Sequence, residues 1–144
     1  ENNILIKHFE GKREGYLDLE DIGDIPCSFH PFIIRNKQKK FEEIRSQDVY
    51  NTACILNEHN TKISIIDGAY YKLNLQKKSV TKEDGFAHKI NLAYIKYQIK
   101  SLKNKNLKIA RVFAIRRINN IKYIQWKINN NNKSFYEYLN KKEN

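Results

Sequence analysis

Five polar side chains in the segment Leu107–Ile128 are of the types that bind nucleic acids. Lysine and arginine attract phosphate groups, and an aromatic ring can stack on a base. A surface that combines such cations with an aromatic plane and an amide is what a nucleic-acid-binding sheet needs. The alternative is a solvated outer face of an antiparallel sheet. The five residues are Lys108, Arg116, Tyr123, Gln125 and Lys127.

The element that would bring these five side chains together is a β-hairpin. Strand-favouring residues alternate on both sides of Asn119-Asn120, and two asparagines tolerate the positive φ angles of a tight turn. A two-residue turn would place Phe113 opposite Trp126 on a wholly apolar face. The pattern therefore predicts a hairpin over Leu107–Ile128, with the five polar side chains on its other face.

A second basic surface is predicted on a helix over Phe86–Lys103. At 100° per residue its apolar residues fall into two groups, and its lysines form one stripe within about 60° of arc. No acid is interleaved, so the lysines form no i,i+4 ion pairs and repel one another. We expect a mostly buried helix whose lysine stripe contacts phosphate, the alternative being a solvated face. The stripe, called here the basic ridge, consists of Lys89, Lys96, Lys100 and Lys103.

The charge of the chain favours a polyanionic partner. Its 144 residues include 27 Lys and Arg against 16 Asp and Glu, a net charge of +11. Residues 1–60 hold 8 basic and 11 acidic residues, whereas residues 61–144 hold 19 and 5. We therefore expect the binding surface in the second half. The expected partner is DNA or RNA or, as the alternative, an acidic protein such as an inhibitor.

Several classes of function lack their signatures in the sequence. The five glycines are not clustered into a phosphate-binding loop, and neither HExxH nor a serine nucleophile elbow is present. No run approaches about 18 apolar residues, so we expect no membrane partner. The two cysteines are too few and too far apart for a metal knuckle. They favour free thiols in a reducing compartment, cytoplasm or nucleus, over a single disulfide.

The order of elements over residues 38–117 resembles the core of the PD-(D/E)xK nucleases. A predicted helix and strand lead to Asp67, and a second strand ending in Gln76-Lys77-Lys78 is followed by a helix and a strand. In that family an Asp and the acid of an E-x-K step hold a divalent metal, and the Lys polarises the attacking water. The resemblance implies Mg²⁺-dependent phosphodiester hydrolysis with Asp67 as a metal ligand. Gln76 stands at the place of the acid, Lys78 at that of the lysine, and Ile66 where the family has Pro.

Asp48 is a possible fourth catalytic residue of this set. It falls among the apolar residues of a helix predicted over Lys39–Asn57, where an unpaired buried carboxylate is costly. The resemblance would make it a helix-borne acid. In the alternative, the helix begins near Ser46 and Asp48 lies in its first turn, where free N–H groups and the helix dipole favour an acid. Asp67 has a similar alternative, because Asp67-Gly68 is also a typical hairpin turn.

A second resemblance is to the bromo-adjacent homology domains of chromatin proteins. It rests on IDGAYYKL at residues 66–73 and IARVFAIRRINNIKYIQW at residues 109–126. This resemblance implies a non-catalytic chromatin-binding module.

Together these elements predict a single basic α+β domain over residues 1–144. We expect a mixed or mainly antiparallel sheet of about five or six strands, packed by the helices Lys39–Asn57 and Phe86–Lys103. Tyr16–Ile25 is expected to be an edge segment, only partly buried, whose acids counterbalance the basic half. Further strands are predicted at Asn3–Phe9, at Phe32–Arg35 and within Thr61–Lys78, and a closing helix at Ser134–Asn140.

The function expected from the sequence is nucleic-acid binding, and the resemblance to the PD-(D/E)xK nucleases adds metal-dependent nuclease activity. Because the chain begins with Glu and contains no Met, we expect a fragment or a processed product, such as the C-terminal effector or toxin domain of a longer protein. The alternatives are a non-catalytic DNA-, RNA- or chromatin-binding module and an interaction domain for an acidic protein.

Overall fold

The fold is mainly helical. The computed structural model describes residues 15–24, 44–64, 85–131, 133, 135, 137 and 138. These residues form four helices and one two-stranded antiparallel sheet, so the predicted α+β domain with five or six strands is wrong. The elements are β1 (Tyr16–Leu17), α1 (Leu19–Asp24), α2 (Gln47–His59), β2 (Ile63–Ser64), α3 (Phe86–Lys103) and α4 (Leu107–Asn129).

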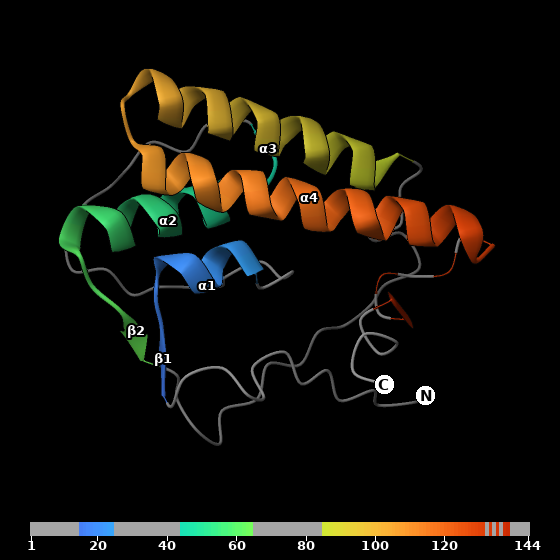
Figure 1. The fold of residues 1–144 in the computed structure, drawn as a ribbon, viewed down its shortest axis with the longest axis horizontal. Coiled ribbons are helices and arrows are strands. Elements are labelled where there is room, and N and C mark those ends of the chain that lie inside the picture. Colours follow the sequence, from blue (N-terminus) through green and yellow to red (C-terminus); the bar gives the residue numbers. More distant parts are fainter. Residues whose placement is uncertain are drawn as a thin grey trace.

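Helix α4 lies at the centre of this arrangement. It packs against α3, α1 and α2, and Figure 1 shows α3 and α4 side by side with α1 and α2 beneath them. The two strands pair in register Tyr16 to Ser64 and Leu17 to Ile63. This pairing joins the segment that enters α1 to the segment that leaves α2.

The segment predicted to be a β-hairpin is the continuous helix α4. Val112 and Phe113, adjacent residues of α4, are both buried. In a strand, adjacent side chains would point to opposite faces. Asn120, assigned to the turn, lies inside the helix, where its Nδ2 donates a 2.8 Å hydrogen bond to the carbonyl of Ala87 in α3. β-Branched residues disfavour a helix by only about 0.5 kcal/mol each. Burial of one side of α4 against three other elements outweighs this preference.

Helix α3 is confirmed with the predicted bounds. Gly85 precedes it with a φ angle of 74°, a conformation that glycine adopts without steric cost. After α3, the N–H of Asn106 donates to the carbonyl of Ser101 at 2.8 Å. The side chain of Asn106 then caps α4 by accepting a 3.4 Å hydrogen bond from the N–H of Ile109. One short turn therefore ends the first helix and starts the second, which makes the pair antiparallel.

Helix α1 is formed by the acidic segment that the sequence placed at a sheet edge. Asp18 Oδ1 accepts hydrogen bonds from the N–H groups of Glu20 and Asp21 at 3.0 and 3.2 Å, and Asp21 Oδ2 accepts one from the N–H of Asp18 at 2.9 Å. This reciprocal pattern is a capping box, with Asp in place of the usual Glu or Gln. Gly23 allows a close approach to α4, because a Cβ there would lie 3.4 Å from the side chain of Ile115.

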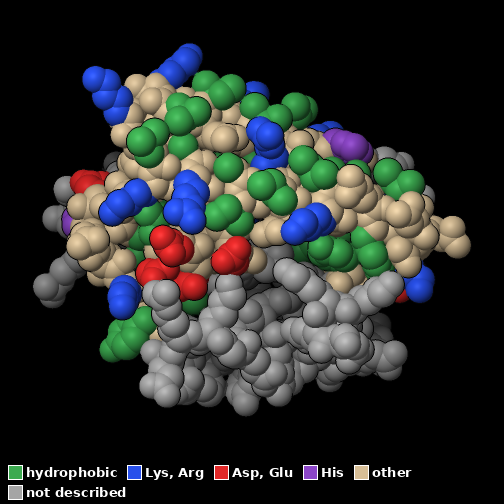
Figure 2. All heavy atoms as spheres, in the orientation of Figure 1, with side chains coloured by type: hydrophobic (Ala, Val, Ile, Leu, Met, Phe, Trp, Pro, Cys, Tyr) green, Lys and Arg blue, Asp and Glu red, His purple; other side chains and the backbone are tan. Residues whose placement is uncertain are grey.

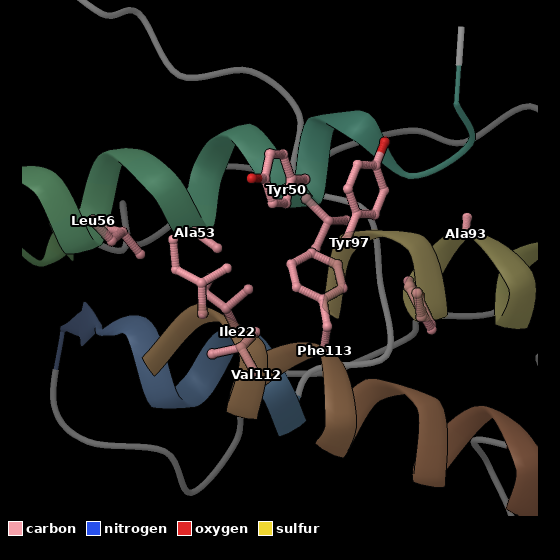
Figure 3. Packing of buried hydrophobic residues seen from close by; sticks show 11 residues of the cluster. Ile22, Tyr50, Ala53, Leu56, Ala93, Tyr97, Val112 and Phe113 are labelled. Carbon is pink, nitrogen blue, oxygen red and sulfur yellow. The ribbon is translucent and has the colours of Figure 1, made fainter. Parts of the chain in front are cut away.

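The core is built around an aromatic group where α2, α3 and α4 meet (Figure 3). Tyr50 and Tyr97 stack with ring centroids 4.4 Å apart, and Phe113 lies 5.2 Å from Tyr97 and 5.7 Å from Tyr50. Each such ring pair contributes about 1 kcal/mol beyond the burial of its area. Ile22 of α1 and Leu17 of β1, predicted to be only partly buried, are 0% and 4% exposed.

Several predicted elements lie partly or wholly outside the described residues. These are the strands Asn3–Phe9 and Phe32–Arg35 and the turn at Asp67-Gly68. Of the predicted closing helix Ser134–Asn140, the described residues Phe135, Glu137 and Tyr138 are helical.

Candidate nucleic-acid interface

The pair α3 and α4, residues 86–129, is called here the basic hairpin. It carries eleven Lys and Arg and no Asp or Glu. Figure 2 shows basic side chains scattered over these helices among hydrophobic ones. Seven of the eleven are exposed, namely Lys89, Lys96, Lys103, Lys105, Lys108, Arg111 and Lys122. With no carboxylate along either helix, their charges add to one positive field.

The basic ridge predicted on α3 is present at the surface. Lys89, Lys96 and Lys103 are exposed. Lys100 is half-buried, and its Nζ lies 5.2 Å from the centre of the Tyr50 ring, a cation–π contact between α3 and α2. At the C-terminal end of the ridge is an open hollow of about 340 Å³. It is lined by Lys96, Ile99, Lys100, Lys103 and Asn104.

The five side chains predicted to share a sheet face do not form one flat surface. Lys108 and Gln125 are exposed, whereas Lys127 and Tyr123 are half-buried. Because α4 is a helix, Gln125 points about 100° away from Lys108 around the axis. The predicted juxtaposition depended on the strand geometry that the structure replaces.

Arg116, the fifth of these residues, is buried inside the fold. It is 5% exposed, and its Nη1 donates a 2.6 Å hydrogen bond to the carbonyl of Ile22. Its Nε donates to the hydroxyl of Tyr94 at 3.2 Å, and the guanidinium lies over the Tyr94 ring. Carbonyls in the last turn of a helix lack partners within that helix, and Ile22 lies in the last turn of α1. Arg116 therefore ties α1 to the basic hairpin.

An aromatic cluster closes the C-terminal end of α4. The ring of Tyr123 meets Phe135 edge to face at 4.9 Å, and Tyr138 lies 5.4 Å from Tyr123 and 5.3 Å from Trp126. Phe135 and Tyr138 of the predicted closing helix therefore pack against α4. Burial raises the pKa of Tyr123 and of Tyr138 above the ordinary value of 10.0. Both phenols are therefore uncharged near neutral pH.

Asp48 occupies the first turn of α2, as the alternative interpretation predicted. The helix begins at Gln47, after Ser46, whose φ angle of 60° is left-handed. The predicted bounds Lys39–Asn57 are therefore wrong, because the described residues 44–46 are not helical and α2 continues to His59. Asp48 Oδ2 is buried and has no hydrogen-bond partner. The other nuclease candidates, Asp67, Gln76 and Lys78, lie outside the described residues, as does the turn that would carry Asp67. Within the described ranges, no group of three or more His, Cys, Asp and Glu is placed to hold a metal ion.

Comparison with known proteins adds no relative. No protein-family model, curated protein or solved structure matches this chain. Among the helices of the described segments, none combines the length and apolarity needed to cross a bilayer.

Three exposed cations of the interface were missed by sequence reasoning. Lys105 lies in the turn between the helices, and Arg111 and Lys122 lie on the outer side of α4. They were missed because the strand pattern directed attention to alternate residues. The signal that could have found them is the absence of any acid from residue 86 to residue 129.

Proposed function

We propose that the chain binds nucleic acid, DNA or RNA, along the basic hairpin. The observation that carries this proposal is the absence of acid over two packed helices on which seven cations are exposed. Each Lys or Arg that pairs with a phosphate releases condensed counterions, so such a surface gains affinity from the entropy of the released ions. The contacts are with backbone phosphates, and binding is expected to depend little on base sequence.

The carboxylates of α1 limit where a polyanion can lie on the basic hairpin. The carboxylates of α1 lie beneath the basic hairpin and on the same face as several of its cations (Figure 2). Asp18 and Asp21 of this group are held in the capping box of α1. This placement leaves the outer sides of α3 and α4 for a polyanion, with a repulsive edge that limits how far the nucleic acid extends toward α1.

The test is the salt dependence of binding to duplex DNA, single-stranded DNA and a structured RNA. We expect log K to fall steeply and linearly with log salt concentration for at least one of them. Replacing Lys108, Arg111 and Lys122 by Gln is expected to reduce the slope by about 2 to 3, roughly one for each lost phosphate contact. The matched control is Lys62→Gln, which removes an exposed charge outside the hairpin and should leave the slope unchanged.

A flat salt dependence for all three nucleic acids would contradict the proposal. So would an equal loss of affinity in Lys62→Gln and in the hairpin variants. Because all the substituted side chains are exposed, circular dichroism spectra should stay the same, which separates binding effects from unfolding.

The second candidate is a Mg²⁺-dependent nuclease that uses Asp67, Gln76, Lys78 and Asp48. The observation that favours it is the buried, unpartnered Oδ2 of Asp48, since a metal ion or a metal-bound water would satisfy such an oxygen. We expect Mg²⁺-dependent cleavage of one of the three nucleic acids on a denaturing gel, lost in chelator and in Lys78→Ala. Intact strands in the presence of Mg²⁺ and Mn²⁺ would exclude cleavage and leave binding as the function.

A further inference from the structure

Helix α3 presents a second apolar face that the described part of the fold does not cover. Its first apolar side packs inward, with Tyr94 and Tyr97 in the core. On the other side, Leu92, Ile99 and Leu102 are 59%, 48% and 49% exposed. Both sides were expected to be buried, so the exposed one calls for a partner.

The spacing on this face is that of a coiled-coil seam. Steps of four, three, four and three residues separate its members, which is the a and d pattern of a heptad. The opposite heptad positions are those that enter the core, including Tyr97, so the seam points directly away from the fold. The face, called here the α3 seam, consists of His88, Leu92, Ile95, Ile99 and Leu102.

Lysines border the α3 seam on one side only. Lys96 and Lys103 occupy the e position after Ile95 and after Leu102, where coiled coils place the charges that select a partner. Both are exposed, and the hollow of about 340 Å³ lies beside them and Ile99. The other flank carries Asn91 and Gln98, which are uncharged. The apolar strip and its charged border together define the kind of partner that can dock on the α3 seam.

We propose that the α3 seam docks an acidic amphipathic helix of a protein partner. Leucine or isoleucine side chains of such a helix would cover Leu92, Ile99 and Leu102, and its Glu or Asp residues would face Lys96 and Lys103. A second copy of the chain fits less well. If two chains paired antiparallel through this seam, the lysines of one chain would face the lysines of the other. If they paired parallel, the lysines of each chain would face Asn91 and Gln98 of the other, which carry no compensating charge.

The docked helix would also compete with nucleic acid. Lys96 and Lys103 belong to the basic ridge and border the α3 seam, so acids that pair with them remove two cations from phosphate binding. The seam thus supplies a means by which an acidic protein inhibits the proposed function. Docking itself does not rest on nucleic-acid binding, since the apolar seam is independent of that activity.

The test uses a designed 21-residue helical peptide with Leu at its a and d positions and Glu at e and g, which keep it from pairing with itself. Fluorescence anisotropy with the full chain should show that it binds at least about tenfold more tightly than a scrambled peptide of the same composition. The double variant Leu92→Gln/Ile99→Gln should weaken binding by about tenfold or more. The matched control Ile118→Gln/Ile128→Gln replaces exposed isoleucines of α4 and should leave the affinity unchanged.

Four results would overturn the docking proposal. Two concern the peptide: equal binding of the designed and scrambled peptides, and unchanged binding of the designed peptide by the α3 double variant. The third is sedimentation of the chain as a dimer that the double variant dissociates. The fourth is binding of anionic lipid vesicles through the seam without binding of the peptide. Peptide binding without nucleic-acid binding would refute the proposed function alone. Nucleic-acid binding without peptide binding would refute the docking proposal alone.

Discussion

Phe113→Ala should lower the free energy of unfolding by about 4 kcal/mol. Phe113 is fully buried, and its ring contacts Tyr50 of α2 and both Tyr94 and Tyr97 of α3. The cavity left by the ring would lie where three helices meet, so no single helix can close it by moving alone. Chemical denaturation of the purified variant measures the loss directly.

The same stability measurement on a variant of Val112, the residue before Phe113, also tests whether this segment is a helix. Val112 is also buried, because a helix places it beside Phe113. Val112→Ala is therefore expected to cost about 1.5 kcal/mol through the two lost methyl groups. The matched control is Ile118→Ala, which shortens a side chain that is 52% exposed on the same helix and should cost well under 1 kcal/mol. A pattern in which Val112→Ala is neutral would support a strand instead of α4.

Arg116→Met is expected to destabilise the protein by about 3 kcal/mol. Methionine fills much of the same space but donates no hydrogen bonds, so the carbonyl of Ile22 and the hydroxyl of Tyr94 both lose a charged donor. The carbonyl suffers most, because it lies in the last turn of α1 with little access to water. Thermal and denaturant unfolding should both show the loss, with α1 released from the basic hairpin first.

The control for this variant is Arg111→Met, which removes an exposed cation from the same helix. It should change stability by no more than about 0.5 kcal/mol. The two variants should behave oppositely in nucleic-acid binding. Arg111→Met should make the slope of log K against log salt concentration less steep. Folded Arg116→Met should leave that slope unchanged, because a buried guanidinium does not reach phosphate. Equal stability of the two variants would show that the hydrogen bonds of Arg116 contribute nothing to the fold.

The contrast between Arg116 and Arg111 shows why an interface is hard to read from residue types. Both residues were equally plausible phosphate contacts by chemistry alone. Which one reaches the surface depends on the rotation of α4 about its axis, and packing against α1 and α3 fixes that rotation. The same rotation exposes Lys122, which the strand pattern had not singled out.

Local signals in the sequence were sufficient for α3. For α2 they left two starts open, Lys39 or the region of Ser46, and only the structure shows that the helix begins at Gln47. Gly85 precedes an apolar pattern with helical period that continues to Lys103, and these signals fix the bounds of α3 without reference to any other element. For Asp48 the sequence allowed a place on the apolar face of a longer helix or in the first turn of a shorter one, and the structure shows the second. The segregation of charge, with the acids early and the cations late, is likewise a property of the sequence alone.

The tertiary structure alone decided the form of α4 and the role of Arg116. The residues of α4 prefer strands by a margin too small to resist the burial of Ile109, Val112 and Phe113 on one side of a helix. Arg116 lies in that same buried strip, where a carbonyl of α1, distant in sequence, supplies its partner. Contacts between residues far apart in the chain outweigh the local strand preference of α4, because that preference amounts to only about 0.5 kcal/mol for each residue. The sequence by itself therefore determined the charge of the surface and the helix α3, and packing determined which cations that surface presents.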